Sequence, residues 1–276
     1  MSGFVIKLLT TWQFVLKRGL ANWKLMSSVL LGVLLASAIM SGTVIYFDAL
    51  RELALRHTIN GLTVREIDIL AQGQRAPTTR ADYNLVANAA EEEFEERIDW
   101  LLRGRMQAGK SPTFFLTEEG QEEAAGKDNA RSYFAFLPQL DEHTTLATGR
   151  RPVDQPLEVT ADTLTIEAMI PQDAAALFGL AQGDRVSAVP HWDDLISVVT
   201  VEISGTFTRN DPTAEFWALE DGVLSAATGP SFRTAPFVIS EAGYLDVLGP
   251  AFLKMDSTYA RLLSVVGDRI NSGNSV

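Results

Sequence analysis

The sequence GRMQAGKS at residues 104–111 matches the glycine, lysine and serine spacing of a phosphate-binding P-loop. In such a loop, backbone amides around Gly104 and Gly109 cradle phosphates. Lys110 reaches the terminal phosphates, and the hydroxyl of Ser111 holds Mg²⁺. A true P-loop follows a buried strand and opens a helix, whereas here a helical pattern ends near Gly104. We therefore interpret the match as a surface turn at a helix C-terminus. The minor alternative is that the protein is a membrane-tethered nucleotide-binding enzyme.

Other residue types that carry chemistry are scattered. His57, His143 and His191 stand alone, without the helical spacing of a metal-binding pair. His191 opens the sequence HWDD, where a base beside a carboxylate would be available, but no nucleophile accompanies it. The chain has no cysteine, which excludes a disulfide framework, a thiolate nucleophile and a cysteine zinc site. We predict a protein that is not an enzyme and has no cofactor or metal site.

An acidic run, EEEFEE, occupies residues 91–96. Clustered carboxylates could bind a metal or act as a general base, but either role usually requires groups that perturb their pKa values. The local sequence supplies nothing that would desolvate them. We interpret the run as a solvated helix face.

Hydrophobic periodicity indicates the elements around these groups. A helical pattern covers residues 80–105, where Thr79 stands at the start and Asp82 suits the positive end of the helix dipole. Strand patterns lie on either side of this helix, at residues 63–70, 113–116 and 132–137. This mixture predicts an α+β fold with a mixed α/β domain.

An uncharged segment at residues 25–47 precedes this domain, between Lys24 and Asp48. At about 1.5 Å of rise per residue, it is long enough to cross a hydrocarbon core of roughly 30 Å. It exceeds the apolar region of a secretory signal, so we predict a transmembrane helix at 25–47. Residues 1–24 form a basic amphipathic pattern suited to the interface of a lipid bilayer, and 48–60 continue the helical period as a stalk.

Charge sets the expected orientation. No Asp or Glu precedes the span, so the segment before it is basic and all 35 acidic residues follow it. The net charge of the whole chain is -12. Basic residues favour the cytoplasmic side, which predicts a cytoplasmic N-terminus and an extracytoplasmic domain at 61–276. An acidic domain repels phosphate backbones, so nucleic acid is not an expected partner.

The stretch from residue 146 to 217 contains a specific series of turn and cap signals. A Gly-Arg-Arg-Pro turn at residues 149–152 leads to a strand at 164–168, and a short helix at 172–178 stops at Gly179. A second strand pattern covers 196–207. From the residues alone, the glycine and aspartate of the Gly183-Asp184 turn are turn residues and not ligands.

This order resembles the extracytoplasmic core domain of the MacB- and FtsX-like family of ABC transporter permeases. The similar segments are GRRP at 149–152, AALFGL at 175–180, QGD at 182–184, VEISGTF at 201–207 and the Phe216-Trp217 pair. The resemblance implies a membrane subunit in a bacterial plasma membrane, served by a separate cytoplasmic ATPase and further transmembrane helices. The outer domain would then move or grip a substrate or partner.

The resemblance leaves several alternatives open. Family members carry further spans after the outer domain, and residues 262–266 are too short to be one, so we expect a fragment of a longer permease or a stand-alone tethered domain. A single-pass sensor or binding module is the main rival hypothesis. A homodimer and a division of the outer domain into lobes at 61–145 and 146–240 are also left open.

Overall fold

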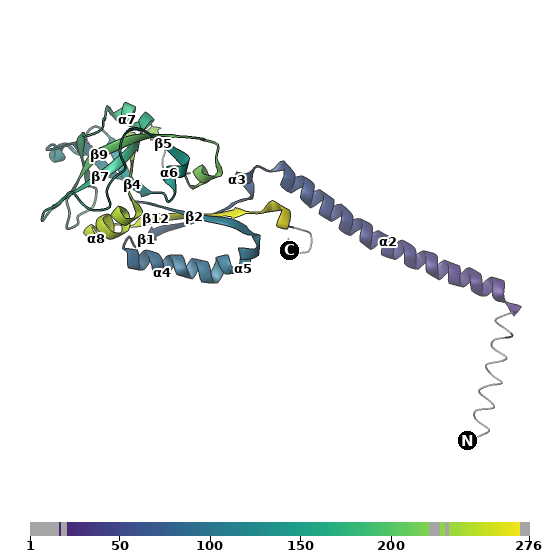
Figure 1. Ribbon diagram of the computed structural model, residues 1–276. Helices are drawn as coiled ribbons and strands as arrows, with labels where there is room; N and C mark the ends of the chain where they lie inside the picture. Colours follow the sequence, from purple (N-terminus) through teal and green to yellow (C-terminus); the bar gives the residue numbers. More distant parts are fainter. Residues whose placement is uncertain (1–16, 18–20, 221–226, 230–231, 271–276) are drawn as a thin grey trace, which may run out of the picture. The chain divides into compact units, whose positions relative to one another are not determined.

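The computed structural model describes residues 17, 21–220, 227–229 and 232–270 (Figure 1). Most of the amphipathic helix predicted for residues 1–24 lies outside the described residues. The chain divides into two compact units, one formed by residues 1–61 with 270–276 and the other by Leu62–Arg269.

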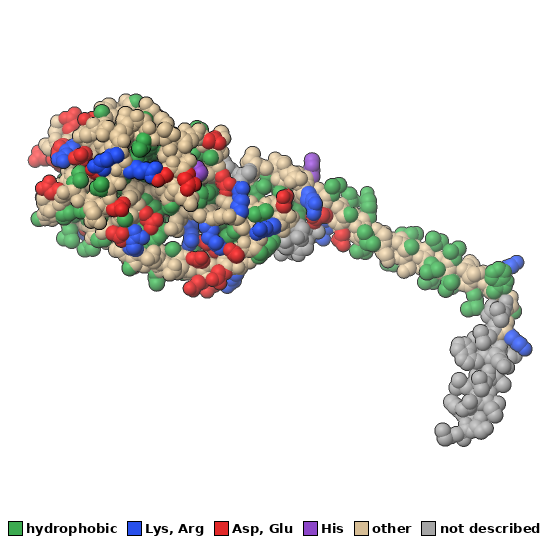
Figure 2. Space-filling view, viewed as in Figure 1, with side chains coloured by type: hydrophobic (Ala, Val, Ile, Leu, Met, Phe, Trp, Pro, Cys, Tyr) green, Lys and Arg blue, Asp and Glu red, His purple; other side chains and the backbone are tan. Residues whose placement is uncertain are grey.

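The first unit contains α2 (Trp23–Gly61), a helix of 39 residues. Figure 2 shows hydrophobic side chains along its visible face. By length and composition, α2 is the one candidate membrane span within the described part of the chain. At about 1.5 Å per residue it extends about 58 Å, which exceeds the hydrocarbon core of a bilayer. The predicted continuation of the apolar helix through residues 48–60 is confirmed.

The second unit is built on a single 12-stranded sheet of mixed direction, with helices packed against it. This confirms the predicted class, a long apolar helix followed by a mixed α/β domain. The strands are β1 (Ile69–Ala76), β2 (Leu102–Lys110), β3 (Phe114–Glu118), β4 (Ala130–Phe136), β5 (Thr144–Gly149), β6 (Glu158–Val159), β7 (Thr163–Pro171), β8 (Arg185–Pro190), β9 (Val198–Arg209), β10 (Ala227–Gly229), β11 (Phe232–Val238) and β12 (Ser257–Val265).

The helical elements of this unit are short. They are the α-helices α3 (Val64–Ile67), α4 (Arg80–Ala90), α5 (Glu96–Ile98), α6 (Leu140–His143), α7 (Gln172–Phe178) and α8 (Gly249–Ala251), the π-helices η1 (Glu91–Glu95) and η5 (Gly243–Leu248), and the 3-10 helices η2 (Asp99–Leu101), η3 (Glu122–Ala124), η4 (Glu215–Glu220) and η6 (Gly267–Arg269).

A ring of strand pairings forms one part of the sheet. The strand order β4-β3-β8-β9-β7-β11 closes because β11 also pairs with β4, in parallel register. Alternate residues on these strands point inward, as the two-residue period of a strand requires. On β7, for example, Leu164, Ile166 and Ala168 belong to one buried cluster together with Phe114 and Phe134. The ring is therefore a packed barrel.

The strands β1, β12 and β2 form an antiparallel extension of this barrel. The extension joins the barrel where Gly109 and Lys110 of β2 pair with β4. Figure 1 shows α4 and α5 running along one face of these strands. The opposite face contributes Ala108, Ala260 and Leu262 to a second buried cluster, which includes Phe216 and Trp217.

Several predicted elements are confirmed. The strands at 113–116 and 132–137 correspond to β3 and β4, and those at 164–168 and 196–207 to β7 and β9. The helix at 172–178 is α7, and Gly179 ends it with φ of 68°, the left-handed cap that favours glycine. Asp184 accepts a hydrogen bond from the amide of Ala181 at 2.7 Å, as a turn residue does.

Two predicted elements are wrong. The strand expected at 63–70 is α3 followed by β1, which begins only at Ile69. The helix expected at 80–105 starts as predicted, because Thr79 accepts the amide of Asp82, but it passes through the π-helix η1 and ends before Leu102. Residues beyond that point pair with β12, so long-range pairing overrides the local helical pattern.

The core does not divide at residue 146. One buried cluster combines Phe114 and Phe134 with Leu164 and Val199, and the other combines Ala108 with Phe207. Both clusters therefore include residues from before and after residue 146, the expected boundary between the two lobes.

Candidate functional site

The residues of the P-loop pattern lie on a β-strand and just beyond it. Gly104 and Gly109 are within β2 and pair with β12. Ser111 follows the strand, and its Oγ accepts a hydrogen bond from the amide of Phe134 at 2.9 Å. This segment is therefore extended and engaged in sheet pairing, where a P-loop would turn its amides toward a phosphate. The interpretation as a surface turn at a helix C-terminus is wrong.

Lys110 is half-buried at the junction between the extension and the barrel. Its Nζ lies 4.1 Å from the centre of the Tyr133 ring, within the range of a cation–π interaction. Burial lowers the pKa of this lysine. The absence of a cofactor at Gly104, Gly109, Lys110 and Ser111 stays a prediction.

Two of the histidines make different contacts within the domain. His143 stacks on Phe216 with 3.9 Å between ring centres, and His191 Nδ1 lies 3.0 Å from the carbonyl oxygen of Thr113. No group of three acidic or histidine side chains suitable for a metal ion occurs among the residues that the structure describes.

Asp194, in the HWDD sequence, anchors a loop. Its carboxylate accepts hydrogen bonds from the amides of Leu195, Leu253 and Lys254. Partial burial alone would raise the pKa of Asp194, but these amide hydrogen bonds together lower it below its ordinary value. The carboxylate thus joins two loops, and its contacts are structural.

The Gly-Arg-Arg-Pro turn crosses the outer surface of the barrel. Gly149 has φ of 73°, and the nearby Gly205 lets the two backbones approach closely. Arg150 covers the buried carboxylate of Glu167, and Val153 donates its amide to the same carboxylate at 3.1 Å. The motif therefore links β5, β7 and β9 through close packing and a charge pair.

One carboxylate of the acidic run is buried. The side chain of Glu95 is 2% exposed, and it lies between Arg105 at 2.8 Å and Arg261 at 3.0 Å. The expectation that nothing desolvates this run is wrong at Glu95, because the arginines come from β2 and β12 beneath the helix. Its neighbours Glu91, Glu92, Glu93 and Glu96 are exposed, as a solvated face requires.

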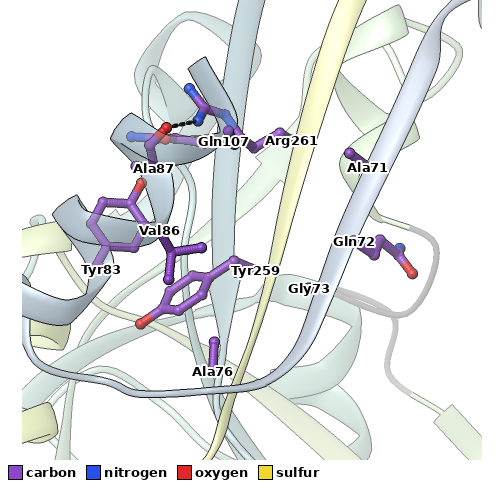
Figure 3. Close-up of a pocket in the computed structure, with 11 residues that line it drawn as sticks. Ala71, Gln72, Gly73, Ala76, Tyr83, Val86, Ala87, Gln107, Tyr259 and Arg261 are labelled. Atoms are coloured by element: carbon purple, nitrogen blue, oxygen red, sulfur yellow. Dashed lines mark hydrogen bonds between the residues drawn. The ribbon is translucent and has the colours of Figure 1, made fainter. Parts of the chain in front are cut away.

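A groove of about 220 Å³ opens between α4 and the extension (Figure 3). The residues that line it on α4 are Tyr83, Val86, Ala87 and Ala90, and those on the strands are Ala71, Gln72, Gly73, Ala76, Gln107, Tyr259 and Arg261. The groove exists because β1 places small residues opposite the helix. Ala71 pairs with Arg261 and Gly73 with Tyr259, so these two small residues share the face that α4 covers.

Polar groups gather at one end of this groove. Arg261 Nη1 donates to the carbonyl oxygen of Ala87 at 2.8 Å, the bond drawn in Figure 3. Tyr83 is 6% exposed, and its hydroxyl has no hydrogen-bond partner among the described residues. Burial raises the pKa of Tyr83, so its hydroxyl stays protonated and can donate. In Figure 3 this hydroxyl points toward Ala87 and Gln107.

A second, polar cavity of about 260 Å³ adjoins the groove. The two share Gln107 and Arg261, and the polar cavity is also lined by Arg105, Gln139 and Glu241. Apolar walls with a few convergent polar groups are typical of ligand sites. The groove and this cavity form the candidate site.

No family model and no curated protein matches this chain. Among solved structures, it is similar to the crystal structure of a domain from Porphyromonas gingivalis that is named as part of a permease protein. The two share 14% sequence identity with a TM-score of 0.34, over 74% of this chain and 75% of that chain. A similarity at this level adds nothing to the functional argument.

Sequence reasoning missed the groove and the burial of Glu95. The signal that could have found the groove is the pair Ala71 and Gly73, two small residues spaced by two on one strand face. For Glu95, the sequence offers no signal that separates it from Glu93, which also stands beside Phe94. Both features depend on β12 lying beside β1 and β2.

Proposed function

We infer that this chain is the membrane-anchored part of an ABC transporter of the MacB/FtsX type. In this proposal, α2 crosses the plasma membrane and residues 62–269 form an extracytoplasmic domain. A separate cytoplasmic ATPase and other transmembrane helices supply movement, and the outer domain handles a substrate or a partner.

The observation that carries this proposal is the arrangement along the chain. An uncharged segment at residues 25–47 lies within the helix α2, which ends at Gly61, and the compact acidic domain begins at Leu62. Basic residues precede the span and all acidic residues follow it, which supports a cytoplasmic N-terminus. The motif at 149–152, on which part of the resemblance to the permease family rests, pairs in β5 with β9 and holds Glu167 of β7.

Topology and partners can be tested separately. Reporter fusions to each end of the full chain are expected to place residue 1 in the cytoplasm and residue 276 outside. Purification from native membranes under mild detergent is expected to recover an ATPase with a P-loop. Reporters that place both ends in the cytoplasm would contradict the topology, and recovery of the intact chain without an ATPase would contradict the transport role.

A single-pass binding module is the second candidate function, and the groove beneath α4 is the observation that favours it. Both functions predict the same topology. The co-purified ATPase separates them, because a binding module needs none.

A further inference from the structure

The groove beneath α4 is elongated. From Tyr83 to Ala90 the helix rises about 10 Å, and the strand β1 runs beside it. Its volume of about 220 Å³ exceeds that of an apolar cavity of about 150 Å³ known to bind benzene. Because a long helix face and a long strand face bound it, this space suits an unbranched chain better than a ring system.

The buried hydroxyl of Tyr83 indicates where a polar atom of the ligand would lie. A buried donor without a partner is costly, and an acceptor oxygen would remove that cost. Tyr259, on the opposite wall, is already satisfied, because its hydroxyl donates to the carbonyl oxygen of Pro77 at 3.1 Å. The Tyr83 hydroxyl is therefore the donor that the groove offers to a ligand.

The surrounding charges favour a neutral acceptor. Glu241 pairs with Arg80 at 2.9 Å, so the charges of these two side chains compensate each other. Arg261 is engaged by Glu95 and by the carbonyl oxygen of Ala87. A carbonyl oxygen of an ester or amide meets these conditions, and the adjoining polar cavity leaves room for the rest of the polar group.

We propose that this groove binds the acyl chain of a neutral ester or amide, with the carbonyl oxygen accepting a hydrogen bond from Tyr83. The chain lies along Ala71, Gly73 and Val86, and the polar group lies toward Gln107. The site is a property of the folded domain and holds whether or not the protein belongs to a transporter.

Photolabelling of the full chain in phosphatidylcholine nanodiscs tests the site. The probe is the methyl ester of dodecanoic acid with a diazirine on the alkyl chain, and mass spectrometry locates the label. Labelling of peptides from residues 66–97 reports the groove. Labelling of the apolar helix α2 reports membrane partition and serves as the internal reference.

Gly73→Val is the blocking variant. A Cβ at this position meets no atom within 4 Å, so the side chain enters open space and should not disturb folding. Relative to α2, label on 66–97 is expected to fall at least fivefold. Gln74→Val is the matched control, because it places the same side chain on the same strand outside the groove lining, and its label is expected to be unchanged.

Tyr83→Phe tests the hydrogen bond. It is expected to reduce binding of the ester roughly two- to tenfold, because it removes one hydrogen bond. Binding of a dodecane probe without the carbonyl is expected to be unchanged. Equal loss of both probes would overturn the hydrogen bond.

Three further outcomes would overturn the site. They are unaltered labelling after Gly73→Val, tighter binding of the free dodecanoic acid than of its ester, and label on α2 without any label on residues 66–97.

Discussion

Arg150 covers the carboxylate of Glu167 through two of its guanidinium nitrogens. Glu167 comes from β7 and its side chain is 2% exposed, whereas the side chain of Arg150 is 58% exposed at the barrel surface. The charge that is hidden from water is therefore the carboxylate. If Arg150 is removed, the folded protein loses stability mainly because the buried carboxylate of Glu167 is left without its partner.

Arg150→Ala is expected to lower the melting temperature by several degrees, measured by circular dichroism. The adjacent Arg151→Ala is the control, because Arg151 pairs with Asp141 on the surface and such pairs contribute little. Glu167→Gln combined with Arg150→Ala is expected to recover part of the loss, since the double variant buries no charge. Equal effects of the two arginine variants would contradict the role of the buried carboxylate.

Glu95 is expected to be the most sensitive position of the acidic run. Glu95→Ala removes the carboxylate between Arg105 and Arg261, which are 36% and 19% exposed, and the loss of its charged contacts is expected to cost about 1.5 to 3 kcal/mol. Denaturant unfolding measures this loss. Glu93→Ala is the control, because its pair with Arg97 is exposed on both sides and contributes about 0.3 to 0.5 kcal/mol. A loss below 1 kcal/mol for Glu95→Ala would contradict the pairing.

Some features of this fold can be predicted from the local sequence, and others, such as the burial of Glu95, cannot. The helix α7 and its cap at Gly179 follow from signals within a few residues, and they are predicted correctly. Glu95 and Glu93 are alike in sequence, and only the arginines beneath Glu95 distinguish them. Those arginines are brought there by strand pairing over long separations, which no local pattern encodes.

The strand β2 was not predicted for the same reason, because it depends on long-range strand pairing. Residues 102–110 contain no β-branched side chain, so their local propensity does not favour a strand. They form one because β12 pairs with them along nearly their whole length. The groove depends on the same pairing, since Gly73 faces α4 only when β1 lies beside β12.

Tyr83→Phe is expected to leave the unliganded protein equally stable or to stabilise it by up to about 1.5 kcal/mol. The substitution removes a buried hydroxyl that has no hydrogen-bond partner among the described residues, so no hydrogen bond is lost. Tyr259→Phe is expected to destabilise by about 0.5 to 1.5 kcal/mol, because it removes the hydrogen bond to Pro77. Chemical denaturation in lipid-free medium measures both. A clear destabilisation by Tyr83→Phe would mean that its hydroxyl already has a partner.

Asp68 and Asp246 are expected to affect stability with opposite dependence on pH. Burial, together with the nearby carboxylate of Glu215, raises the pKa of Asp68 above its ordinary value of 3.8. Its neutral form is therefore favoured in the folded state, and the stability that it contributes is lost as pH rises through the raised pKa. The hydrogen bond from Arg80 lowers the pKa of Asp246, so its contribution is present above 3.8 and lost as pH falls through the lowered pKa.

Asp68→Asn is therefore expected to stabilise the protein relative to the parent chain at pH 7, and this gain should shrink as pH falls toward 3.8. Asp246→Asn is expected to destabilise at pH 7, with a loss that shrinks as pH falls below 3.8. Thermal unfolding of the parent and both variants from pH 3 to 8 measures the two differences. Because Asp68 Oδ2 is buried without a donor and lies beside Glu215, a loss of stability in Asp68→Asn at pH 7 would show that the carboxylate is the required form.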